Sequence, residues 1–64
     1  MHPSTHALLR FFEFEHLPRP LQEVSAPFSD LALEMADRLP DSPETTVCLR
    51  KLLEAKDCAV RAAL

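Results

Sequence analysis

The sequence predicts an all-α fold: an antiparallel helical hairpin, with a short N-terminal arm or helix, that assembles into a homo-oligomeric helical bundle. Three observations carry this prediction. Apolar residues recur at helical spacing in two long segments, and proline and serine mark where those segments begin. The chain has 64 residues and therefore forms a single domain, residues 1–64, near the size at which one core is marginally stable.

The first predicted helix spans residues 20–39. Pro20 suits the first helical turn, where its missing N–H costs nothing. An apolar stripe follows at steps of three and four: Leu21, Val24, Phe28, Leu31 and Met35. Pro27 allows two solutions, because proline inside a helix removes a hydrogen bond. Either one helix, possibly kinked, runs across Pro27, which the unbroken stripe favours, or a new helix starts with Ser25 as its N-cap.

The second predicted helix spans residues 43–64. Asp41 and Ser42 can both cap it, with Ser42 favoured because Pro43 then takes the first helical position and Glu44 lies at the positive helix end. The connection, residues 39–41, is so short that the two helices must be antiparallel neighbours.

This second helix carries two apolar stripes. One contains Cys48, Leu52, Ala55, Ala59 and Ala62, and the other contains Leu49, Leu53 and Val60. A two-helix hairpin covers one stripe per helix, so the surplus predicts self-association.

Residues 1–19 form an aromatic arm. Residues 7–14 can make two helical turns or remain extended, since isolated helices this short are marginal. The run 10–14 holds three of the four aromatic residues beside Arg10. Such rings can stack nucleobases while neighbouring cations bind phosphates. Alternatively, the rings cover the hairpin, and we expect Phe11 to pack against it.

The composition excludes several classes of function. There is no glycine, hence no phosphate-binding P-loop, and no arrangement suggests a nucleophile, so we expect no enzyme. The net charge of −3 disfavours binding to nucleic-acid polymers, and no apolar run reaches the ~20 residues of a membrane span. The N-terminus lacks signal-peptide features.

The cysteines and histidines predict neither a disulfide nor a metal site. Cys48 and Cys58 lie ten residues apart on one helix, roughly 15 Å along its axis, and cannot pair within one chain. We expect both thiols to pack, in a cytoplasmic protein. His2 and His6 are too few for zinc, so we expect no metal and no cofactor.

Charged residues of the second helix have two interpretations. Lys56 interrupts an apolar stripe, and its stem either snorkels along that surface or aims a cation at an anionic ligand. Two ion pairs are expected at a spacing of four, Arg50 with Glu54 and Asp57 with Arg61.

His16, beside a proline turn, is either an exposed loop histidine or part of a site.

Residues 14–18, Phe-Glu-His-Leu-Pro, and residues 52–62, ending in Ala-Val-Arg-Ala, resemble the two signature ends of a phage-encoded family. These are helical-hairpin sponge proteins of the anti-CBASS and anti-Thoeris type, which sequester cyclic nucleotide immune signals. The resemblance covers about residues 14–64. It implies a homo-oligomer, typically a hexamer, in which an aromatic residue, here Phe14, stacks a base. The family's phosphate-binding lysine is replaced by Ser29.

The sequence thus predicts a non-enzymatic protein, in the host cytoplasm if phage-encoded, that traps a cyclic nucleotide and counteracts anti-phage defence. Phe14 would stack a base and His16 would hydrogen-bond the ligand, while phosphate would be held by some of Arg10, Arg19, Lys51, Lys56 and Arg61. The alternative is a small adaptor or regulatory subunit whose surplus apolar face docks a partner protein.

Overall fold

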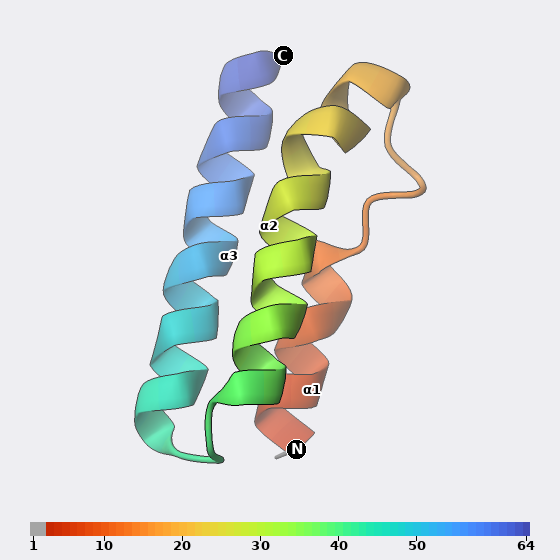
Figure 1. Cartoon of the computed structure of the whole chain (residues 1–64). Coiled ribbons are helices and arrows are strands. Elements are labelled where there is room, and N and C mark those ends of the chain that lie inside the picture. The colour runs from red at the N-terminus through yellow and green to blue at the C-terminus, as the bar shows by residue number, and fades with distance from the viewer. Residues whose placement is uncertain (1–2) are drawn as a thin grey trace.

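The computed structural model describes residues 3–64 and is all-helical over that range. Its elements are α1, Pro3–Leu9, a 3-10 turn η1, Arg10–Phe12, then α2, Arg19–Arg38, and α3, Pro43–Ala63. Helices α2 and α3 lie side by side and antiparallel, and α1 passes behind α2 (Figure 1). His2, considered above as a zinc ligand, lies outside the described residues.

The predicted hairpin is confirmed. The N-cap of α3 is Ser42, whose Oγ accepts a hydrogen bond from the Thr45 amide at 3.2 Å. The Thr45 hydroxyl in turn donates to the Pro40 carbonyl at 2.6 Å, which fixes the connection between the helices. Pro43 stands in the first turn of α3, as its fixed φ angle favours.

Helix α2 runs through Pro27 without interruption. Ser25 is fully buried inside this helix, so the alternative in which Ser25 caps a new helix is wrong. Pro27 and Glu23 are both exposed, and Glu23 holds the carbonyl that loses its partner to the proline ring. Water can therefore replace the missing hydrogen bond.

Residues 3–12 of the N-terminal arm are helical rather than extended, and they pack on both long helices. This helix starts before the predicted range 7–14 and ends at Phe12. Its Phe12 is 1% exposed and forms the core with Ala32 of α2 and Leu49 of α3. Half-buried apolar residues surround this core: Leu8, Leu9, Phe28, Met35, Ala36, Leu52 and Leu53. The arm thus covers part of the surface that the sequence assigned to self-association, and that surplus is smaller than predicted.

The buried line of α2 differs from the predicted stripe. It passes through small residues at helical spacing, namely Ser25, Ser29, Ala32 and the half-buried Ala36. Leu31, placed in the stripe, is 42% exposed. Small side chains on this line allow α1 and α3 to approach α2 together, which moves the larger residues to its flanks.

The two stripes of α3 also have unequal burial. Leu49 is buried, and Leu53 and Val60 are half-buried, whereas Cys48, Ala55 and Ala62 are exposed. Both thiols are unpaired and exposed, so the prediction that Cys48 and Cys58 pack is wrong for the single chain. None of the helices in residues 3–64 combines the length and the apolar character that crossing a membrane requires.

Candidate functional site

A groove of about 360 Å³ lies between the N-terminal arm and the C-terminal half of α3. Three permanent cations and two carboxylates line it, and we call it the cationic groove. Its residues are Arg10, Phe11, Glu13, His16, Leu17, Lys56, Asp57, Val60 and Arg61. The volume is at the lower end of the range for small-molecule sites. Four of the seven predicted site residues therefore meet here: Arg10, His16, Lys56 and Arg61.

The turn that carries His16 is held in place by Gln22 of α2. The Gln22 side-chain amide donates to the carbonyls of Glu15 at 3.1 Å and Leu17 at 2.8 Å, on either side of the histidine. The Leu17 amide closes the turn by donating to the Phe14 carbonyl at 3.0 Å. His16 itself is exposed at the groove, which leaves its imidazole accessible to a ligand.

The cations of the groove differ in their partners. The Lys56 side chain is 12% exposed, and its ammonium pairs with the Asp57 carboxylate at 2.9 Å. Arg61 Nη2 lies 3.5 Å from Cys58 Sγ, a weak acceptor. Among residues 3–64, the structure gives neither Arg10 nor Arg61 a carboxylate partner. These two guanidinium groups are the cations most available to an anion.

Both predicted ion pairs of this helix are wrong. Asp57 pairs with Lys56 instead of Arg61, and Glu54 pairs with Lys51 at 3.8 Å instead of Arg50. The first difference follows from tertiary packing, because α3 turns Lys56 and Asp57 together toward the groove that the arm encloses.

The two neighbouring rings of η1 have opposite environments. Phe12 is 1% exposed, whereas Phe11 is 63% exposed and lines the cationic groove. The expectation that Phe11 packs against the hairpin is therefore wrong, because successive residues of a helical turn point in different directions. An exposed ring beside cations is suited to stacking a base.

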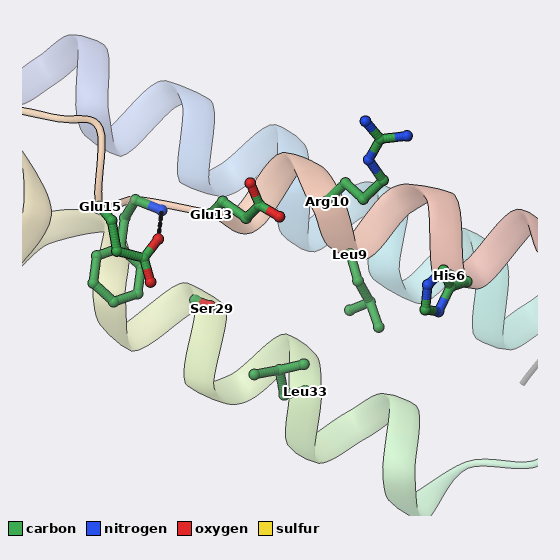
Figure 2. A pocket seen from close by; sticks show the side chains of 8 residues that line it. His6, Leu9, Arg10, Glu13, Glu15, Ser29 and Leu33 are labelled. Carbon is green, nitrogen blue, oxygen red and sulfur yellow. Dashed lines mark hydrogen bonds between the residues drawn. The ribbon is translucent and has the colours of Figure 1, made fainter.

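Phe14 lines a second, adjacent groove of about 330 Å³. Figure 2 shows this groove between the arm, with His6, Leu9, Arg10 and Glu13, and α2, with Ser29 and Leu33. We call it the Phe14 groove; its residues are His6, Leu9, Arg10, Glu13, Phe14, Glu15, Ser29 and Leu33. The Phe14 amide donates to the Glu15 carboxylate at 3.2 Å. Arg10 and Glu13 line both grooves, so one arginine is shared by a groove that contains Phe11 and a groove that contains Phe14.

The remaining predicted residues lie elsewhere. Arg19 is the first residue of α2 and Lys51 is an exposed residue of α3, and neither lines the two grooves. Ser29, which the resemblance to sponge proteins places at their phosphate-binding lysine, is 9% exposed in the wall of the Phe14 groove. The structure thus gives phosphate-binding candidates on the arm and α3 rather than on α2.

Sequence reasoning missed Phe11, Glu13 and Asp57 as groove residues. One signal was present: Thr5, Leu8 and Phe12 recur at helical spacing, so a helical arm buries Phe12 and leaves Phe11 outside. No comparable signal points to Asp57, since its proximity to the arm depends on long-range packing.

Among residues 3–64, no group of three or more His, Cys, Asp or Glu side chains is arranged to hold a metal ion. Comparison with models of protein families, with curated proteins and with solved structures gives no match. The fold and the site therefore define the class of this protein as a small three-helix protein with two adjoining grooves that share an arginine.

Proposed function

We propose that this protein is a non-enzymatic binding protein for a small nucleotide with two bases, of the cyclic dinucleotide class, and that it sequesters this ligand. The observation that carries the proposal is the position of Arg10 between two grooves that each contain an aromatic ring, Phe11 in one and Phe14 in the other. A ligand that spans both grooves would place phosphate at Arg10 and one base beside each ring.

The charges of the two grooves support this orientation. Arg61, Lys56 and His16 join Arg10 in the cationic groove, which favours phosphate there. The Phe14 groove has two carboxylates, Glu13 and Glu15, and its wall includes Leu9 and Leu33. That lining suits an uncharged base, with carboxylates able to accept hydrogen bonds from exocyclic amino groups.

The resemblance to sponge proteins supports the same ligand class from different residues. It assigns base stacking to Phe14, and the closing Ala-Val-Arg-Ala motif includes Val60 and Arg61 of the cationic groove. Capture of an immune second messenger would then work by mass action, without turnover, and would counteract anti-phage defence.

Calorimetry with a panel of ligands tests the proposal. The panel contains mononucleotides, cyclic di- and trinucleotides and ADP-ribose derivatives. We expect a cyclic dinucleotide to bind more tightly than any mononucleotide and to be recovered intact. Phe11→Ala and Phe14→Ala should each cost about 1–3 kcal/mol of affinity, as loss of base stacking does.

Arg10→Gln should weaken binding and reduce its salt dependence, because a phosphate contact is lost. Lys51→Gln is the matched control, since it removes a positive charge outside both grooves. Failure of every nucleotide to bind, or an Arg10→Gln variant with wild-type affinity, would refute the proposal.

A further inference from the structure

One face of the α2–α3 hairpin is apolar and is not covered by the arm. The arm packs on the opposite side, where Ser29 and Leu33 of α2 and Val60 and Arg61 of α3 line the two grooves. Helical spacing places the following exposed or half-buried residues on the uncovered face: Val24, Phe28, Leu31 and Met35 of α2, with Cys48, Leu52, Ala55, Ala59 and Ala62 of α3. None of them is charged.

Charged residues border this face and are paired within the chain. Arg38 pairs with Glu34 at 2.8 Å along the outer side of α2, and Lys51 pairs with Glu54 at 3.8 Å on α3. An apolar centre with a charged rim is the usual composition of a protein interface. The rim presents both signs of charge, which suits association with a surface of the same kind.

The two helices contribute side chains of different size. The row on α2 is bulky, with Leu31 42% exposed, whereas the exposed positions of α3 on this face are small, namely Cys48, Ala55 and Ala62. A two-fold axis parallel to the helices places α2 of one copy over α3 of the other. The bulky row of each copy then fits against the small row of its partner, so the face is complementary to itself.

The dimensions of the molecule allow an interface close to the lower size limit for a specific dimer. The molecule measures 34 × 18 × 16 Å. A face of 34 by 18 Å has an area of roughly 600 Å², so two such faces approach the lower limit of about 1,200 Å² for specific interfaces. The single chain also has a small core: within residues 3–64, three hydrophobic residues are fully buried, Phe12, Ala32 and Leu49. Further burial in a dimer would add stability that so small a core lacks.

We propose that the uncovered face of α2 and α3 binds a second copy of this chain in a two-fold symmetric dimer. The inference does not rest on nucleotide binding, because both grooves lie on the side of the arm and stay open in the dimer. Leu31 is the central contact residue of this interface.

Light scattering after size-exclusion chromatography tests the proposal. At about 100 μM, within the range where specific homodimers persist, the wild type should have at least twice the single-chain mass of 7.2 kDa. Leu31→Lys should reduce the mass to that of one chain while circular dichroism shows retained helix. Leu33→Lys is the matched control: Leu33 is 55% exposed on the same helix, but on the side of the arm, and its substitution should leave the mass unchanged.

The two cysteines supply an independent measurement. Both are exposed in the single chain, but Cys48 lies on the proposed interface and Cys58 lies on the side of α3 opposite the buried Leu49. In Cys58→Ser protein, alkylation of Cys48 by a maleimide should accelerate on dilution as dimers dissociate. In Cys48→Ser protein, alkylation of Cys58 should not depend on protein concentration.

A wild type with the mass of one chain, or a Leu31→Lys variant that keeps the wild-type mass, would overturn the proposal. So would Cys48 alkylation that is independent of concentration, which decides the matter if Leu31→Lys fails to fold. In each of these cases the apolar face would be free for a different protein, as the adaptor alternative requires.

Discussion

The Lys56 ammonium lies 2.9 Å from the carboxylate of Asp57, the residue that follows it on α3. Consecutive residues of a helix do not face each other, so the lysine side chain must bend toward its neighbour. Its stem occupies the inner side of α3 and is 12% exposed, whereas Asp57 is 45% exposed at the groove. The first interpretation of Lys56 agrees with this burial of its stem. The charge lines the cationic groove, where binding of an anionic ligand stays a prediction.

We predict that Asp57→Asn strengthens binding of an anionic ligand several-fold. The carboxylate repels phosphate and holds the Lys56 ammonium, and the amide does neither. The cost in stability should be at most about 1 kcal/mol, because the pair is partly solvated. Calorimetry measures the affinity. Glu54→Gln is the control, since it makes the same change of charge beside Lys51, outside the groove. Weaker binding by Asp57→Asn would contradict the role assigned to Lys56.

Substitution of the two adjacent phenylalanines should affect the free energy of unfolding very differently. Phe12→Ala should lower it by about 3–5 kcal/mol, because Phe12 is buried against Ala32 and Leu49. Phe11→Ala should change it by no more than about 0.5 kcal/mol, since the ring is 63% exposed. Urea denaturation followed by circular dichroism measures both values. Equal destabilisation by the two variants would mean that the arm does not pack as described.

Ser25→Ala should stabilise the protein. The Ser25 side chain is fully buried, and its hydroxyl has no hydrogen-bond partner among the described residues. An unsatisfied buried polar group costs about 1–3 kcal/mol, and alanine also has the higher helix propensity.

Ser42→Ala is the control for Ser25→Ala, because it should change the stability in the opposite direction. The Ser42 hydroxyl caps α3, and its loss should lower the free energy of unfolding by about 1 kcal/mol. Thermal and urea unfolding of both variants give the comparison. A Ser25→Ala protein less stable than the wild type would show that its hydroxyl has a partner, such as an internal water.

Local signals accounted for the two long helices. The predicted ranges 20–39 and 43–64 agree closely with Arg19–Arg38 and Pro43–Ala63, because the signals that begin them act over one helical turn. The Ser42 cap is an example: its partner, Thr45, is three residues away. Such interactions are encoded by neighbours in the chain and can be recognised without a structure.

The conformation of the arm could not be predicted from local signals in the same way. Seven residues of helix have too little intrinsic stability to form by themselves, so α1 depends on its packing against α2 and α3. The burial of Phe12, the exposure of Phe11 and the composition of the two grooves all depend on that packing. Arg10, His16, Lys56 and Arg61 were selected individually by residue type, but their meeting around one groove was not predicted.

The sequence by itself determined the helical class, the bounds of the hairpin, the N-cap of α3 and the distance along one helix that keeps Cys48 and Cys58 from pairing within one chain. Only the tertiary structure decided that the arm is a third packed helix, that Phe12 is buried and Phe11 exposed, and that Lys56 pairs with Asp57. The physical reason is the range of the interactions involved. Caps and prolines act within a turn, whereas burial depends on contacts between segments that are far apart in the chain, here residues 3–12 and α3.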